Sequence, residues 1–119
     1  MAGKILIVDD EEMVRRVLVE IITRMGFECL YAKNGEEAIQ LLREKNSIQL
    51  LLLDINMPKV DGITVLKEIK NYTHCHDLYI IVMTGDHLRY RLDAILQIGG
   101  NDLMYKHLEL NELKKKTND

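Results

Sequence analysis

Four short apolar runs, each followed by polar residues, constrain most strongly what this chain can fold into. They are Lys4–Val8 before Asp9 and Asp10, residues 50–53 before Asp54, residues 79–83 before Thr84, and residues 103–105 before Lys106. A continuous apolar run of this length is typical of a strand buried on both faces, as in a parallel sheet. Parallel strands bring their carboxyl ends to one edge of the sheet, where ligands of open α/β sheets bind. We therefore expect these polar groups to lie close together and to form a site.

The segment between the first two predicted strands has the spacing of an amphipathic helix. Its apolar residues fall on one stripe, which we expect to pack against the core. They are Met13, Val14, Val17, Leu18, Ile21, Ile22 and Met25. Gly26 follows and is the expected C′ residue, because helices often end in a left-handed residue that glycine adopts without strain. A strand is predicted next, at Glu28–Ala32.

Strand-like and helical patterns continue to alternate along the rest of the chain. Asn34-Gly35 predicts a turn, and a short fifth helix is predicted from Leu110. Further helices are predicted around residues 38–42, 63–69 and 88–96. Right-handed crossovers then make a (βα)5 fold, a doubly wound α/β structure with a five-stranded parallel sheet. The flavodoxin-like strand order 2-1-3-4-5 places a switch point between the first and third strands, beside the acidic residues.

Composition restricts the class of protein further. A chain of 119 residues is expected to form one domain, residues 1–119. Its net charge of -3 argues against direct nucleic-acid binding, and no apolar stretch approaches the roughly 20 residues of a membrane helix. Cys29 and Cys75 are expected to be reduced thiols, and the chain enters its first strand without a signal peptide, so we predict a cytoplasmic protein.

The predicted strand ends carry the groups of a magnesium and phosphate site. Mg2+ prefers hard oxygen ligands, and Asp9, Asp10 and Asp54 supply more carboxylate than a fold gathers without a cation. The Lys106 ammonium and the Thr84 hydroxyl can pair with phosphoryl oxygens. One of the carboxylates would then act as the nucleophile, as in enzymes that form an aspartyl phosphate.

Each of these residues also has a purely structural interpretation. Asp9 and Asp10 can cap a helix and complement its dipole. Thr84 can be an ordinary strand residue or a helix cap, and Lys106 can be a solvated side chain. Their combination on neighbouring strands favours the metal and phosphate site. The run His74-Cys75-His76 is too closely spaced for a structural zinc site and is interpreted as a polar loop.

Taken together, the polar residues resemble the receiver domain of two-component response regulators. The resemblance covers essentially the whole chain, because its motifs follow the strand ends in the expected order. They are Asp9-Asp10, residues 34–38, residues 54–58, Asp61-Gly62, Thr84-Gly85 and Lys106. What this resemblance implies is a phosphorelay protein that uses Mg2+ as its cofactor and a sensor histidine kinase as its partner.

The resemblance implies a role for each acidic residue. Asp54 is the acceptor that takes a phosphoryl group from the histidine kinase. Asp10 binds Mg2+ directly and Asp9 through water. The backbone carbonyl of Asn56 and the Asp54 carboxylate complete the metal ligands.

The resemblance also implies roles for the remaining polar groups. Thr84 and Lys106 contact the phosphoryl group, and Thr84 is the switch hydroxyl. The side chains of Asn56 and Asp86 tune how quickly the acyl phosphate hydrolyses, and since both are polar we expect no unusually long-lived phosphate. The domain would catalyse its own phosphorylation and dephosphorylation without turning over a separate substrate.

Two positions depart from the family pattern. Leu103 stands where receivers usually carry an aromatic switch residue, three positions before the lysine, and His107 stands where a proline usually follows it. By strand alternation, Tyr105 points to the opposite face from Lys106. Because His107 is not a proline, the Lys106–His107 peptide is either trans, with a rearranged loop, or a strained cis bond that costs roughly 3–4 kcal/mol.

The function indicated is a phosphorylation-controlled switch. Its output surface would be the fourth helix, fifth strand and fifth helix, which bind a downstream partner or a second copy of the chain; no membrane is involved. Leu103 and His107 motivate an alternative, a receiver-like interaction module that works without phosphate. A phosphatase of the haloacid-dehalogenase type is a third hypothesis, although Asp54-Ile55-Asn56 lacks that family's second aspartate. Too few residues follow Lys106 for an output domain, so the chain is expected to be a single-domain regulator or a receiver cut from a longer protein.

Overall fold

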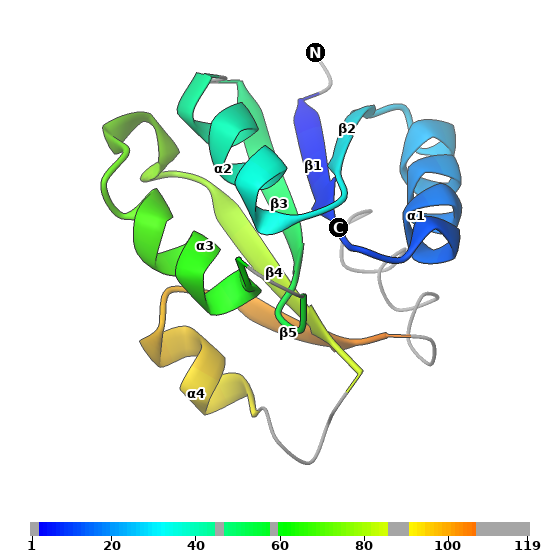
Figure 1. Cartoon of the computed structure of the whole chain (residues 1–119). Coiled ribbons are helices and arrows are strands. Elements are labelled where there is room, and N and C mark those ends of the chain that lie inside the picture. The colour runs from blue at the N-terminus through cyan, green and yellow to red at the C-terminus, as the bar shows by residue number, and fades with distance from the viewer. Residues whose placement is uncertain (1–2, 45–46, 58–59, 86–90, 107–119) are drawn as a thin grey trace.

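Five parallel strands form the centre of the fold (Figure 1). The structure, a computed structural model, describes residues 3–44, 47–57, 60–85 and 91–106. Its strands are β1 (Lys4–Val8), β2 (Glu28–Ala32), β3 (Ile48–Asp54), β4 (Tyr79–Thr84) and β5 (Asp102–Tyr105). They pair in the order β2-β1-β3-β4-β5, with every neighbouring pair parallel. This confirms the predicted α/β sheet and its strand order.

Helices cover both faces of the sheet (Figure 1). They are α1 (Glu12–Arg24), α2 (Gly35–Glu44), α3 (Gly62–Ile69) and α4 (Leu92–Gln97), and a short 3-10 helix η1 (Thr73–Cys75) precedes β4. The buried side chains of α1 pack with one face of the sheet, and those of α2, α3 and α4 pack with the other. A sheet covered on both sides requires apolar residues at successive strand positions, which is why the strands are continuous apolar runs.

Strand alternation decides on which side of the sheet each strand end places its polar residue. The core layer under α1 includes Ile7, Leu52 and Met104. Two positions after these residues come Asp9, Asp54 and Lys106, so the three ionisable groups share the α1 side. Val82 belongs to the opposite layer, so Thr84, two positions later, lies on the side of α3 and α4. The site therefore has an ionic part and a hydroxyl part on different sides of the sheet edge.

The buried stripe of α1 is narrower than predicted. Val14, Leu18 and Ile22 are buried, whereas Met13 is 73% exposed and Val17 is 38% exposed. Successive helical residues are about 100° apart, so the residue before each buried position points along the flank of the helix. The prediction that Met13 and Val17 belong to the core is therefore wrong. Gly26 follows α1 with φ 92°, which confirms its predicted role at the helix end.

Two predicted boundaries also differ from the structure. Asn34-Gly35 does not form a free turn, because Gly35 is already helical and the Asn34 side-chain oxygen accepts a hydrogen bond from the Glu37 amide at 2.9 Å. Asn34 thus caps α2. β3 begins at Ile48 and extends through Asp54, beyond both ends of the predicted run. The expected fifth helix from Leu110, and Leu88 of the expected fourth helix, lie outside the described residues.

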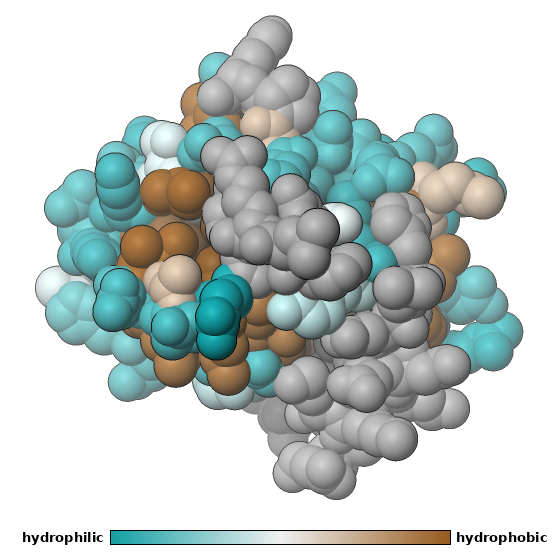
Figure 2. All heavy atoms as spheres, turned by 90° about the horizontal axis from the view of Figure 1, so that it is seen from below, coloured by the Kyte–Doolittle hydropathy of each residue, from teal (hydrophilic) through white to brown (hydrophobic). Residues whose placement is uncertain are grey.

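The helix α4 exposes apolar side chains. Ile95 is fully buried, but Leu92 is 45% exposed and Leu96 is 52% exposed. Figure 2 views the molecule from below, the side on which α4 lies in Figure 1, and shows apolar side chains gathered among hydrophilic ones. Across the described residues, no helix combines the length and apolar character needed to span a membrane.

Candidate functional site

Lys106 is the centre of a buried ion-pair cluster. Its Nζ lies 3.0 Å from Asp9 Oδ2 and 3.2 Å from Asp54 Oδ2. It also donates to Glu11 Oε1 at 2.6 Å. The side chains of Asp9 and Asp54 are 0% and 1% exposed, and that of Lys106 is 6% exposed. Buried charges of this kind persist only when they are paired, so the three strand ends are mutually dependent.

The electrostatics of the cluster are governed by an excess of buried negative charge. Desolvation, followed by the charge of Asp9, raises the pKa of Asp54 to about 7. Desolvation also raises the pKa of Asp9. For Lys106, burial by itself lowers the pKa, but hydrogen bonds to Glu11 and Asp9 outweigh it and the pKa is raised. The lysine is therefore a permanent cation, and one cation does not neutralise the carboxylates around it.

The carboxylates fit a divalent cation. Oxygens of Asp9, Asp10 and Asp54 lie within 4.8 Å of one another, and Asp10 is exposed while the other two are buried. Oδ2 of Asp9 is fully buried and lies 3.0 Å from Lys106 Nζ, but it accepts no hydrogen bond of regular geometry from any described residue. A buried carboxylate oxygen with this single ionic contact has room for a second cation as partner. An all-oxygen donor set with one side open to water suits Mg2+, which keeps several waters when bound.

Asn56 and Thr84 extend the site toward the α3 and α4 side. The Asn56 backbone N–H donates to Asp54 Oδ1 at 3.0 Å, and its side-chain amide donates to Thr84 Oγ1 at 3.1 Å. Thr84 is completely buried. Asn56 therefore connects the carboxylate of Asp54 to the hydroxyl of Thr84 across the edge of the sheet.

Leu103, which stands at a predicted switch position, and Tyr105 lie on the Thr84 side of the sheet. Leu103 is buried in the layer under α3 and α4, and Tyr105 is half-buried against the same layer. Tyr105 is the register partner of Thr84 between β4 and β5. The predicted orientation of Tyr105, opposite to Lys106, agrees with this packing. Asp86, His107 and the Lys106–His107 peptide lie outside the described residues.

The predicted Asp61-Gly62 motif holds α3 against the end of β3. The Asp61 carboxylate caps the helix by accepting hydrogen bonds from the backbone and the hydroxyl of Thr64, both at 2.9 Å. The Gly62 N–H donates to the Ile55 carbonyl at 3.3 Å. A Cβ on Gly62 would lie 2.6 Å from Ile55 Cα, so this close approach requires glycine.

Two contacts of the site were not predicted from the sequence. Glu11, the residue before α1, reaches Lys106, and Arg15 Nη1 donates to the Asp9 backbone carbonyl at 2.7 Å. The only signal for Glu11 is its place in an acidic run after Asp9-Asp10. Arg15 had no signal beyond lying one turn into the predicted helix.

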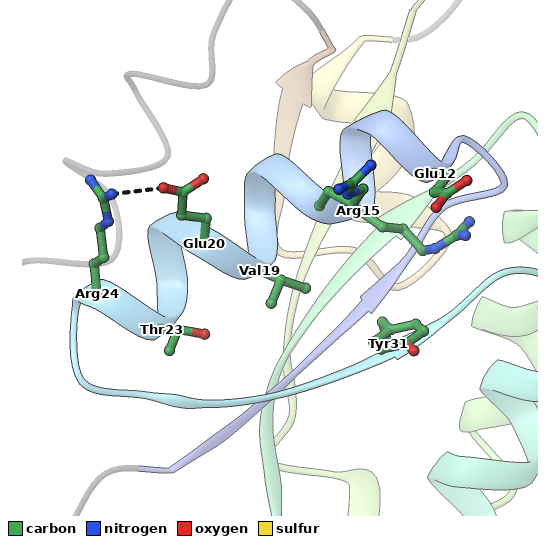
Figure 3. A pocket seen from close by; sticks show the side chains of 8 residues that line it. Glu12, Arg15, Val19, Glu20, Thr23, Arg24 and Tyr31 are labelled. Atoms are coloured by element: carbon green, nitrogen blue, oxygen red, sulfur yellow. Dashed lines mark ion pairs between the residues drawn. The ribbon is translucent and has the colours of Figure 1, made fainter.

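A separate groove of about 510 Å³ lies between α1 and β2 (Figure 3). Side chains of α1 line one wall, including Arg24, which forms an ion pair with Glu20 at 2.7 Å. Tyr31 of β2 lines the other wall. None of the predicted site residues that the structure describes lines this groove, although Arg15, which donates to the Asp9 carbonyl, is one of its lining residues.

The fold and this cluster define a doubly wound α/β domain with an acidic, lysine-containing site at the carboxyl edge of its sheet. A family model described as the response regulator receiver domain matches residues 5–118. A protein named chemotaxis protein CheY homolog, from Campylobacter jejuni, is 31% identical over 117 residues, which cover 98% of this chain and 90% of that protein. The chain therefore belongs to the response regulator receiver family.

Other relatives extend this result. A protein named probable transcriptional regulator ycf27, from Porphyra purpurea, is 40% identical over 113 residues, which cover 93% of this chain but only 44% of that protein. The chain thus spans less than half the length of this relative. The solved structure of the response regulator TrrA from Thermotoga maritima, in complex with Mg(2+)-BeF, superposes with a TM-score of 0.83 at 34% identity and covers 98% of this chain and 96% of that one.

Proposed function

We propose that this chain is a phosphorylation-controlled switch in which Asp54 accepts a phosphoryl group from the phosphohistidine of a sensor kinase. The N–P bond of the phosphohistidine breaks, an O–P bond to a carboxylate oxygen of Asp54 forms, and the imidazole leaves with the bonding electron pair. The observation that carries this proposal is the buried Asp54 carboxylate, 3.2 Å from Lys106 Nζ at the open edge of the sheet.

Different residues would position the Asp54 carboxylate and neutralise charge during this transfer. Asn56 holds one oxygen of Asp54 through its backbone N–H, and Lys106 faces the other. The Lys106 ammonium would offset negative charge on the transferring group, where most catalysis of phosphoryl transfer lies. Mg2+, held by Asp9, Asp10, Asp54 and the Asn56 carbonyl, would supply further charge neutralisation when bound. The side chains of Asn56 and Asp86 would set the rate of hydrolysis.

The signal would leave the site through β4 and β5. The Thr84 hydroxyl would donate to a phosphoryl oxygen. The backbone carbonyl of Thr84 accepts from the Lys106 N–H at 2.8 Å, which supports a link between β4 and β5. The register partner of Thr84 is Tyr105, and Leu103 fills the usual aromatic position with a buried aliphatic side chain. We therefore assign coupling between Thr84 and the α4–β5 surface to Tyr105. The exposed leucines of α4 suit an apolar contact with a downstream partner or a second copy of the chain.

The proposal extends to the cellular location, domain organisation and partners of the chain. The chain would act in the cytoplasm as one domain, residues 1–119, either alone or as the receiver part of a longer regulator. Its cognate histidine kinase is the upstream partner, and neither nucleic acid nor membrane would be bound directly by this domain.

Beryllofluoride with Mg2+, a phosphoryl mimic, and acetyl phosphate test this function. Wild type should gain the mass of one phosphoryl group from acetyl phosphate, and beryllofluoride should shift the NMR signals of α4 and β5. Asp54→Asn should do neither, whereas Asp77→Asn, the same change at an exposed loop residue, should behave as wild type. An unmodified wild type would support the interaction module that works without phosphate.

A further inference from the structure

Arg15 donates a hydrogen bond to the backbone at the end of β1. Its Nη1 lies 2.7 Å from the backbone carbonyl oxygen of Asp9, and the residue is half-buried. A hydrogen bond from a guanidinium is charge-assisted and stronger than one between neutral groups. Among the described residues Arg15 forms no ion pair with a carboxylate of the cluster, so its direct contact with the site is this backbone group.

Arg15 holds both ends of the connection between β1 and α1, which consists of residues 9–11. The Arg15 backbone N–H donates to the Glu11 carbonyl at 3.1 Å and closes the first turn of α1, while the Arg15 side chain donates to the Asp9 carbonyl. On the strand side, the Asp9 N–H donates to the Ala32 carbonyl at 3.2 Å. The connection is therefore tied to the sheet through Asp9 and to α1 through Arg15.

The proposed metal ligand Asp10 lies in the middle of this connection. Its side chain is exposed, and no hydrogen bond of that side chain is found among the described residues. The Asp9 carbonyl and the Asp10 N–H belong to one planar peptide unit, so a bond to this carbonyl restrains ψ of Asp9 and φ of Asp10. These two angles direct the Asp10 carboxylate relative to that of Asp9, and the hydrogen bond from Arg15 therefore helps to orient a metal ligand that it does not touch.

The positive charge of Arg15 would act on the metal in the opposite direction. A guanidinium near the site repels a divalent cation, so by charge alone its removal should strengthen Mg2+ binding. A restraint on the ligand strengthens binding, because Mg2+ demands near-ideal octahedral geometry and an oriented ligand loses less freedom when the ion binds. Salt screens the repulsion, since the Debye length is about 8 Å at 0.15 M, but it leaves the hydrogen bond intact. The sign of the change in affinity therefore separates the two effects.

We propose that Arg15 is a positioning residue that orients the Asp9–Asp10 peptide, and through it the Asp10 carboxylate, for Mg2+. This inference rests on the metal site of the proposed function. Loss of the side-chain donor should weaken Mg2+ binding about three- to tenfold, the range of one hydrogen bond, although a positive charge is lost with it. The Asp10 backbone should also become more mobile in the absence of metal.

Three variants separate the hydrogen bond from the charge. Arg15→Met removes the donor and the charge but keeps an unbranched side chain, and Arg15→Lys keeps the charge with an ammonium donor on a shorter stem. Arg16→Met is the matched control, because Arg16 is exposed and its side chain forms no hydrogen bond or ion pair among the described residues. Arginine, lysine and methionine have similar helix propensities, so α1 itself should be unaffected.

Two NMR measurements at 0.15 M salt, neither of which needs phosphorylation, test the proposal. The first is Mg2+ affinity, from a titration of the amide shifts of Asp9 and Asp10, and the second is the order parameter of the Asp10 amide without metal. We expect Arg15→Met to bind Mg2+ about three- to tenfold more weakly than wild type, with Arg15→Lys between them. Arg16→Met should match wild type. The order parameter should be near the rigid value of about 0.85 in wild type and Arg16→Met and lower in Arg15→Met.

Mg2+ binding by Arg15→Met that is as tight as that of wild type, or tighter, would overturn the proposal, because Arg15 would then act through its charge or not at all. Equal losses in Arg15→Met and Arg16→Met, or an unchanged Asp10 order parameter in Arg15→Met, would also overturn it. A wild type that binds Mg2+ with the expected differences between variants, but takes no phosphoryl group from acetyl phosphate, would overturn the proposed switch and support this role of Arg15.

Discussion

Asp54 is an acidic residue in surroundings that disfavour its charge. Its side chain is 1% exposed, and a second buried carboxylate, that of Asp9, lies in the same cluster. One ammonium serves both, and desolvation with the Asp9 charge raises the pKa of Asp54 to about 7. Without a cation, these surroundings favour the protonated form of Asp54. Bound Mg2+ would favour the ionised form, which is the form that acts as nucleophile, so metal binding would activate the residue.

This raised pKa predicts a pH-dependent stability in the metal-free protein. The folded protein binds the Asp54 proton more tightly than the unfolded chain does, because the pKa of Asp54 is near 3.8 in the unfolded chain. The contribution of Asp54 to stability is therefore fully present at low pH and is lost as the pH rises from about 4 through about 7. The free energies of unfolding of Asp54→Asn and wild type, measured in urea, should diverge over this pH window. Across it, the variant should gain on the order of 2 kcal/mol in stability relative to wild type.

The control for this measurement is the exposed loop residue Asp77. Asp77→Asn should follow the wild-type pH profile throughout. Parallel profiles for Asp54→Asn and wild type would contradict the argument, because they would mean that Asp54 titrates alike in the folded and unfolded states.

At the scale of elements, the contact between α3 and β3 keeps the acceptor in place. Gly62 begins α3 directly against the backbone of Asp54 and Ile55, and Asp61 caps the helix. The helix start therefore fixes the loop through which Asn56 reaches the Asp54 carboxylate. This gives Asp61 and Gly62 a structural role at the start of α3, although neither is a member of the ion-pair cluster.

Gly62→Ala should destabilise the domain by about 2 kcal/mol, because the new Cβ must displace backbone and not a flexible side chain. It would lie 2.6 Å from Ile55 Cα and 2.7 Å from the Asp54 carbonyl oxygen. Gly85→Ala is the matched control, since a Cβ there meets no atom of the described residues within 4 Å. Urea denaturation checks both variants, and a Gly62→Ala protein as stable as Gly85→Ala would show that α3 can move away without cost.

The elements also show what the sequence can and cannot predict. The apolar runs predicted the strands, and their ends placed Asp9, Asp54 and Lys106 together, because strand alternation and parallel pairing are regular. Met13 could not be placed, since the width of a buried helix stripe depends on how the helix lies over the sheet. The Glu11 contact joins residues 95 positions apart through an exposed, flexible side chain, and no periodicity encodes it.

At the scale of the whole molecule, the site and the fold share the same groups. β3 ends in a member of the ion-pair cluster, and β1 and β5 are each followed directly by one. β3 pairs with both β1 and β4 at the middle of the sheet. Excess negative charge at this edge of the sheet destabilises the folded state, and a cation bound there would stabilise it. Global stability should therefore report on occupancy of the site.

Mg2+ should consequently stabilise the folded protein as a whole. A ligand that binds only the folded state adds about 2.7 kcal/mol at a hundredfold excess over its dissociation constant. Asp10→Asn should lose most of this gain without lowering the metal-free stability, because Asp10 is exposed and its oxygen belongs to the predicted ligand set. Asp77→Asn should keep the full gain. Thermal or urea unfolding with and without Mg2+ measures these differences, and an equal Mg2+ response in Asp10→Asn and Asp77→Asn would show that the cation acts by general screening and not at the strand ends.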